Sequence, residues 1–286
     1  MSQQKRSLLL LELLTAFLFI LVFSPFYIVV INAFKGRFQV LTDVLGLPAD
    51  WGQLALNLKA VLDSPNLKFW ASATSSVIIT VLSLVVITLF SSMGAWVLVR
   101  MKTKTSQWLF MMYVAAMVVP FQVVMLPLIA WMRMIHDVTG LQVLRTYGGM
   151  IFAYLGFGSS LSIFLYHGFI KSIPLELEQA AAIDGCSRWQ VFFQIIRPML
   201  KPVTVTVLVL NGIWIWNDYL LPLLMLGTGN EIQTLPIAIA SYVGSFVKQW
   251  ELIMLALVLC MIPVVVFYLF AQKYIIKGMV EGSLKG

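Results

Sequence analysis

The sequence predicts an all-α, polytopic membrane protein with six transmembrane helices, in which both ends of the chain lie on the cytoplasmic side. Of its 286 residues, 60% are hydrophobic and only 11% are charged. Ordinary soluble domains carry about 25% charged residues, so this composition excludes an ordinary soluble domain. The apolar residues also gather in runs of about 20 or more, which is the length that one helix needs to cross a bilayer.

Six apolar runs give the predicted spans. The first covers about 27 residues, which is too long for the core of a signal peptide. The second is rich in small and β-branched residues, the composition that membrane helices use for close packing. The third contains Pro120 and Pro127; the kinks they predict suit a pathway wall and also an inert bundle. In chain order the spans are Leu8–Phe34, Phe69–Val99, Gln107–Trp131, Gly148–Ile170, Val203–Leu226 and Leu252–Gln272.

These spans divide the chain into two predicted parts. Residues 1–68 comprise the first span and an extracytoplasmic segment of mixed polarity. Residues 69–286 comprise a core of five spans, and this core contains a polar loop at 171–202. That loop is the most charged and most clearly patterned segment of an otherwise apolar chain.

The first half of the loop predicts a short helix that ends at a glycine. Pro174 suits the first helical position, because its fixed φ angle matches a helix. Glu176 and Glu178 then fall in the first turn, where the helix dipole favours negative charge. Gly185 adopts at little cost the left-handed conformation that ends many helices.

The second half predicts another helix, which begins at Ser187 and is ended by Pro198 and Pro202. Ser187 and Gln190 have the spacing of a capping box. A helix of about ten residues is about 15 Å long, half of a bilayer core, so it does not span. It is either an amphipathic interfacial segment or a docking element for a partner protein. Its apolar residues predict a single stripe: Trp189, Phe192, Phe193 and Ile196.

The distribution of Lys and Arg predicts the orientation. Cytoplasmic segments carry an excess of these residues, and six spans place both termini and the loop 171–202 on one side. The predicted inner segments hold twelve: Lys5, Arg6, Arg100, Lys102, Lys104, Lys171, Arg188, Arg197, Lys201, Lys273, Lys277 and Lys285. The outer segments hold seven: Lys35, Arg37, Lys59, Lys68, Arg133, Arg145 and Lys248. The formal charge of +7 thus follows topology and does not indicate nucleic acid.

The sequence offers little for catalysis. Neither a phosphate-binding G-x-x-x-x-G-K-[ST] motif nor a G-x-S-x-G nucleophile motif occurs. His136 and His167 are far apart, and the two cysteines, Cys186 and Cys260, give no metal-ligand spacing. We therefore expect no catalytic residue, no cofactor and no metal site.

Polar residues in the fifth span allow two interpretations. In one, the run from Trp216 to Tyr219 anchors the helix end at the outer interface, where Trp and Tyr are favoured. In the other, amide and indole groups line a pathway for a hydroxyl-rich solute. The candidate pathway residues are Asn211, Trp214, Asn217 and Asp218.

The loop resembles the coupling loop of ATP-binding-cassette (ABC) importer permeases, on the letters Gln179-Ala180-Ala181, Asp184-Gly185-Cys186, Phe192, Ile195 and Pro198. The family usually has Glu where Gln179 stands and Ala where Cys186 stands; Gln179 keeps the ability to hydrogen-bond but lacks the charge for an ion pair with an ATPase arginine. The resemblance implies a type I importer fold whose loop inserts into a cytoplasmic ATPase. It assigns this role to Gln179, Ala180, Ala181, Asp184, Gly185, Trp189, Phe192 and Pro198.

The resemblance extends from about Phe69 to the end of the chain. The run Trp216-Asn217-Asp218-Tyr219, Pro222 and the tail Gln272-Lys273-Tyr274 with Lys277-Gly278, Gly282 and Lys285-Gly286 look like carbohydrate-importer permeases of the maltose and glycerol-phosphate type. This implies a multi-pass protein of the bacterial cytoplasmic (inner) membrane that imports a sugar. The implied partners are a second, non-identical permease, a cytoplasmic ATPase dimer and an extracytoplasmic solute-binding protein.

Two rival functions follow from the same composition. An ion-gradient-driven secondary transporter predicts charged or broken-helix ion sites at mid-membrane and usually inverted repeats. A membrane scaffold without a pathway would use the small residues and amides for packing only. The sequence shows none of the features that the transporter predicts, and the scaffold does not account for the patterned loop.

Overall fold

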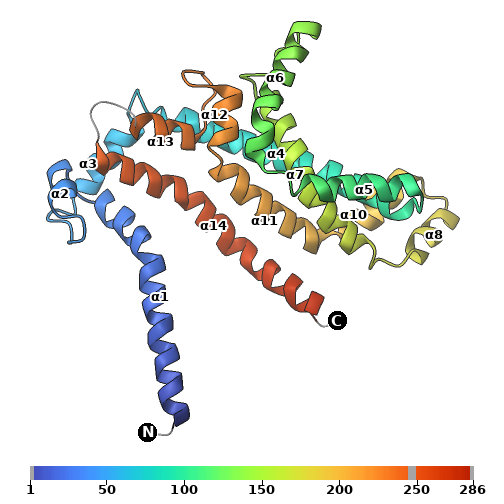
Figure 1. Cartoon of the computed structure of the whole chain (residues 1–286), viewed down its shortest axis with the longest axis horizontal. Coiled ribbons are helices and arrows are strands. Elements are labelled where there is room, and N and C mark those ends of the chain that lie inside the picture. Colours follow the sequence, from blue (N-terminus) through green and yellow to red (C-terminus); the bar gives the residue numbers. More distant parts are fainter. Residues whose placement is uncertain (1–2, 244–248, 284–286) are drawn as a thin grey trace. The chain divides into compact units, whose positions relative to one another are not determined.

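The computed structural model describes residues 3–243 and 249–283, and every regular element in these ranges is helical (Figure 1). Five helices are long and apolar enough to cross a membrane, or six when one bent pair counts as a span. This confirms the all-α class. Lys248, Lys285 and Gly286, used above for orientation and resemblance, lie outside the described residues.

The long helices follow the predicted spans in order. Three agree closely with the prediction: α1 (Gln3–Ala33), α4 (Phe69–Arg100) and α7 (Tyr147–Ile170). The others are α6 (Phe121–Thr139) and α14 (Trp250–Ser283). The bent pair joins Arg188–Met199 to α11 (Lys201–Asn217) at 75°. Shorter helices between them are α2 (Arg37–Thr42), α3 (Gln53–Leu62), α5 (Lys104–Ala116), α12 (Leu220–Leu226) and α13 (Leu235–Val243).

The third span is not the continuous helix that the sequence predicts over Gln107–Trp131. α5 ends at Ala116 and α6 begins at Phe121. Pro120 causes the break, since proline lacks an N–H and disfavours the helical conformation of the residue before it. α6 also extends beyond Trp131 into the first part of the predicted polar connection and ends at Thr139, where Gly140 forms the C-cap with φ 72°.

The fifth span, predicted over Val203–Leu226, is also divided. α11 ends at Asn217, and Asp218 has an extended backbone with φ −71° and ψ 128°. The Asp218 carboxylate accepts hydrogen bonds from the backbone N–H groups of Leu220 and Leu221 at the start of α12. Such side-chain bonds satisfy the unpaired donors of a new helix, so Asp218 itself begins α12.

Residue contacts divide the chain into two compact units. Unit 1 comprises residues 1–70 and 238–263, and unit 2 comprises residues 71–237 and 264–286. In unit 1, the side chain of Lys35 is buried and donates to the carbonyl oxygens of Asp43 and Val44 at 2.6 and 3.2 Å. These bonds stabilise the segment that follows α1.

Unit 2 is packed through small residues on α7. The Ser162 hydroxyl donates to the Gly158 carbonyl at 2.7 Å, and the buried Asn211 amide of α11 donates to that hydroxyl at 3.1 Å. A Cβ atom on Gly158 would lie 2.6 Å from Cδ1 of Ile87 on α4. The missing side chain therefore permits the close approach of α4, α7 and α11.

Gly158→Ala should lower the thermal stability of the purified protein, because overpacking at such a contact costs about 1–3 kcal/mol. Gly156→Ala, two residues earlier on α7, is the matched control, since its Cβ meets nothing within 4 Å. Adding Ile87→Val to Gly158→Ala removes the clashing methyl group and should recover part of the loss. Thermal unfolding in detergent measures all three, and equal effects of the two glycine variants would contradict the packing role.

Candidate functional site

The loop 171–202 begins with α8 (Glu176–Ile183), which ends through a tight set of backbone bonds. Gly185 has φ 81°, and its N–H donates to Ala182 while that of Cys186 donates to Ala181. These two bonds form a Schellman motif, which requires a left-handed residue at this position. The predicted role of Gly185 in ending the first helix is confirmed.

The second half of the loop starts at once. Ser187 and Gln190 form the predicted capping box, in which each side chain bonds the other residue's backbone N–H. Three short helical segments follow without a gap: α9 (Arg188–Gln190), the π-helix η1 (Val191–Ile196) and α10 (Arg197–Met199). Pro198 lies inside this helical stretch and does not end it as predicted, since the turn comes at Leu200.

The apolar residues of this segment form two faces, where the sequence predicts a single stripe. Phe192 and Ile196 are buried within the chain. Trp189 and Phe193 are exposed, and their rings stack with centroids 6.1 Å apart. Each pair has i, i+4 spacing, and the wider winding of the π-helix separates the two pairs around the axis. One face therefore packs inward while the other remains free.

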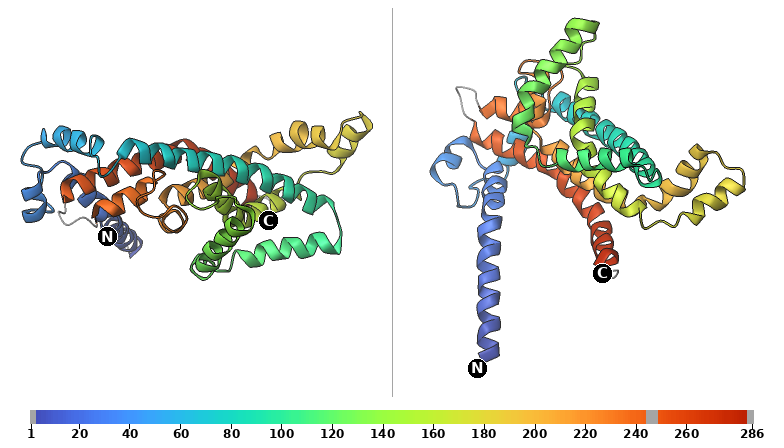
Figure 2. Two further views of the ribbon diagram at one scale, coloured as in Figure 1. Left: turned by 90° about the horizontal axis from the view of Figure 1, so that it is seen from above. Right: turned by 45° about the vertical axis from the view of Figure 1, so that its right-hand side comes forward.

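The outward surface of the loop is unusually apolar. Ile183 is 86% exposed and Trp189 is 63% exposed, and Figure 2 shows this segment (yellow) projecting from the other helices of unit 2. Gln179, Ala180, Asp184, Gly185 and Pro198 are also exposed, whereas Ala181 and Phe192 are buried. The predicted coupling residues thus comprise an exposed majority and two residues that hold the loop in shape.

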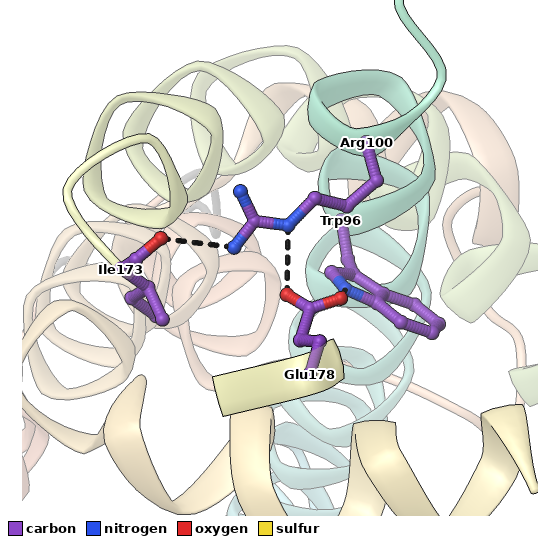
Figure 3. A network of polar contacts seen from close by, with 4 residues as sticks. All are labelled: Trp96, Arg100, Ile173 and Glu178. Carbon is purple, nitrogen blue, oxygen red and sulfur yellow. Dashed lines mark hydrogen bonds and ion pairs between the residues drawn. The ribbon is translucent and has the colours of Figure 1, made fainter. Parts of the chain in front are cut away.

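The inward surface is tied to α4 by one carboxylate. The Arg100 Nε atom lies 2.7 Å from Oε1 of Glu178, and the Trp96 indole N–H donates to Oε2 at 3.0 Å. Arg100 also donates to the Ile173 carbonyl oxygen at 3.0 Å. Figure 3 shows Arg100 lying between the Glu178 carboxylate and the Ile173 carbonyl, with Trp96 beside Glu178. Both oxygens of Glu178 are therefore satisfied by the end of α4.

Sequence analysis missed this connection. It interprets Arg100 as a topology charge and Glu178 as a first-turn charge, because the two lie 78 positions apart. The available signal was an arginine at the end of a span and a carboxylate in the loop on the same predicted side. An aromatic contact adds to the connection, since the rings of Trp96 and Phe192 lie 5.5 Å apart.

A cavity of about 1130 Å³ lies among α4, α5, α6, α7 and α11 of unit 2. Asn211 and Trp214 line it, as do the polar Ser91 and Ser159.

Asn217 and Asp218 are not part of the lining of this cavity. The Asn217 amide donates to the Ile213 carbonyl oxygen, and the Asp218 carboxylate accepts from the Tyr154 hydroxyl at 3.1 Å. Of the four candidate pathway residues, the structure brings two to the cavity. The wall includes several aromatic side chains: Phe90, Tyr113, Phe121, Trp131, Phe152, Phe157 and Trp214.

Several helices long enough to cross a bilayer define this chain as a multi-pass membrane protein. A family model described as "binding-protein-dependent transport system inner membrane component" matches residues 89–281. The chain belongs to this family, whose members are transport subunits.

Relatives and solved structures agree with this assignment. The chain is 41% identical to a "probable starch degradation products transport system permease protein" of Thermoanaerobacterium thermosulfurigenes, over 96% of each chain. It is 33% identical to a melibiose/raffinose/stachyose import permease protein of Bacillus subtilis, over 100% of this chain and 99% of that one. A bacterial ABC transporter that imports the acidic polysaccharide alginate has a chain with the same fold, at a TM-score of 0.79, 20% identity, and 96% and 98% coverage.

Removing either partner of the Arg100–Glu178 pair should loosen the loop. We expect Arg100→Gln and Glu178→Gln to be non-additive in a double-mutant cycle, with a coupling of about 1–2 kcal/mol. This coupling free energy lies between the values typical of exposed and of buried ion pairs, because the side chains of Arg100 and Glu178 are 19% and 11% exposed. Thermal unfolding gives the cycle, and limited trypsin cleavage after Arg188, which Trp189 follows, reports the loop. The matched control is Glu176→Gln, an exposed carboxylate in the same helix; an equal loosening by this control would contradict the assignment.

Proposed function

We propose that this chain is a permease subunit of an ATP-driven ABC importer for carbohydrate in the bacterial inner membrane. The observation that carries the proposal is the two-faced loop 171–202. Its inner face is bonded to α4 through Glu178, and its outer face exposes Trp189 and Ile183 to the surroundings. An apolar surface of this kind on a short projecting segment suits insertion into a cleft of another protein.

ATPase coupling follows from this arrangement. In the proposed complex, closure of a cytoplasmic ATPase dimer moves the outer face of the loop. Glu178 and Phe192 pass this movement to α4 through Arg100 and Trp96. A rigid-body shift of this type converts a small displacement at one site into an opening elsewhere. The family description "binding-protein-dependent" supports an extracytoplasmic binding protein as a further partner.

A second permease chain and a sugar solute complete the proposal. Another structure with this fold contains a periplasmic protein bound to an alginate pentasaccharide, at a TM-score of 0.69 and 16% identity. The named relatives carry starch degradation products, melibiose, raffinose and stachyose. Aromatic walls with a few polar groups, as in the cavity beside Trp214, are suited to sugar rings. Membership of this family disfavours the secondary transporter considered above.

Crosslinking tests the coupling proposal. In a background with Cys186 and Cys260 replaced, Trp189→Cys should form a crosslink with a cysteine in the surface cleft of the ATPase, and ATP should change its yield. Phe192→Cys is the control within the same segment, because Phe192 is only 1% exposed. It should give little crosslink in either state. Failure of Trp189→Cys to react in correctly inserted protein would refute docking by this loop.

A tryptophan variant tests the cavity as the solute pathway. Trp214→Ala should lower solute uptake at least several-fold while ATPase assembly is retained, and Trp214→Phe should keep much of the activity because it preserves an aromatic face. Radiolabelled maltotriose and raffinose serve as probes in reconstituted vesicles. Trp70→Ala is the control, since Trp70 is exposed and lies outside the cavity. Unchanged uptake in Trp214→Ala would remove this residue from the pathway.

A further inference from the structure

A second, smaller cavity lies at the end of unit 2 where the loop 171–202 begins. Its volume is about 630 Å³, and it is bounded by the end of α4, the start of α5 and the end of α7. Three cationic side chains line it, those of Arg100, Lys102 and Lys171, and none of its lining residues is acidic. A concave site with this charge favours an anionic ligand.

The charges of this cavity are only partly neutralised. Arg100 is paired with Glu178, whereas Lys102 and Lys171 have no carboxylate partner among the residues that the structure describes. Lys171 also follows directly on the C-terminus of α7. Two ammonium groups thus remain to attract a ligand of negative charge.

A largely buried histidine lies in the wall of the same cavity. His167 is only 8% exposed, and its ring stacks on Phe110 with centroids 3.7 Å apart. Neither ring nitrogen is among the fully buried, unpaired atoms of the described residues, so the polar edge of the ring stays accessible from the cavity. Because His167 lines the cavity, a bound ligand with acceptor oxygens would satisfy it.

Exposed apolar side chains border the cavity near α5, beside the polar Ser106 and Gln107 of that helix. Met101 and Met111 line the cavity and are themselves exposed, and Trp108 on the same helix is 71% exposed. A soluble anion would make no favourable contact with these apolar side chains. An acyl chain extending from an anionic group would cover them, and tryptophan is favoured at the level of lipid head groups.

We propose that this cavity binds the phosphate head group of an anionic phospholipid, with the acyl chains lying along α5. Lys102, Lys171 and the free donors of Arg100 would surround the phosphate, and His167 would donate to one of its oxygens. The site is independent of the solute that the transporter carries. Under the proposed topology it opens to the cytoplasmic leaflet, because Lys171 begins the loop 171–202.

Lipid retention by the intact complex tests the proposal. The full chain is purified in a neutral detergent with the subunits that accompany it, and native mass spectrometry follows the binding of added phosphatidylglycerol and phosphatidylcholine. Lys102→Gln with Lys171→Gln should weaken the binding of one phosphatidylglycerol roughly ten- to thirtyfold, since each lysine near an anionic lipid surface contributes about 1 kcal/mol. His167→Phe keeps the ring stack with Phe110 and should weaken it to a smaller extent.

The matched control is Lys104→Gln with Lys201→Gln, which removes two exposed lysines at this end of unit 2 that do not line the cavity. An equal loss in this control would show general attraction to charge and overturn the site. Displacement of the lipid by millimolar inorganic phosphate would assign the cavity to a soluble anion instead. Binding that appears only after the ATPase is stripped away would mean that a protein partner covers the cavity.

Discussion

The carboxylate of Glu178 is the interaction on which the arrangement of the loop 171–202 depends. It accepts from Arg100 and from Trp96, which are four residues apart and so lie on one face of α4. A displacement of α8 therefore acts on a helix of 32 residues and not on a loose connection. Without this carboxylate, the apolar outer face of the loop would still be exposed, but nothing polar would join its first helix to α4.

The turn inside the loop makes that connection stiff. The Schellman motif at Gly185 and the capping box at Ser187 follow each other directly, so each helix end has part of its otherwise unpaired backbone groups bonded within the turn. No Cβ contact would be made at position 185, where the surroundings are open. Glycine is needed there for its backbone conformation alone. The loop consequently has two short helices at a defined angle, which suits the transfer of a hinge motion.

Features set by local chemistry could be predicted from the sequence, and features set by distant contacts could not. The capping box, the glycine turn and the long helices α1, α4 and α7 depend on neighbouring residues, and each was predicted correctly. The pair of Arg100 with Glu178 depends on how α4 meets the loop, which spacing does not reveal. The division of the fifth span at Asp218 is an exception: its cause is local, since Asp218 accepts from Leu220 and Leu221, but no proline or glycine marks the break. The π-helix that separates the two apolar faces has no sequence signal that we recognise.

In the larger cavity, two residues that look like equal candidates in the sequence differ in their hydrogen bonds and exposure. Asn211 and Trp214 are one helical turn apart, and both were candidates for solute contact. The Asn211 amide group already donates to the Ser162 hydroxyl and to the Val207 carbonyl oxygen, so its donors serve helix packing. Trp214 is 38% exposed and packs edge-on against Tyr154. Because the indole retains a free face while the amide does not retain free donors, the proposed pathway assigns solute contact in this part of the cavity to the aromatic residue.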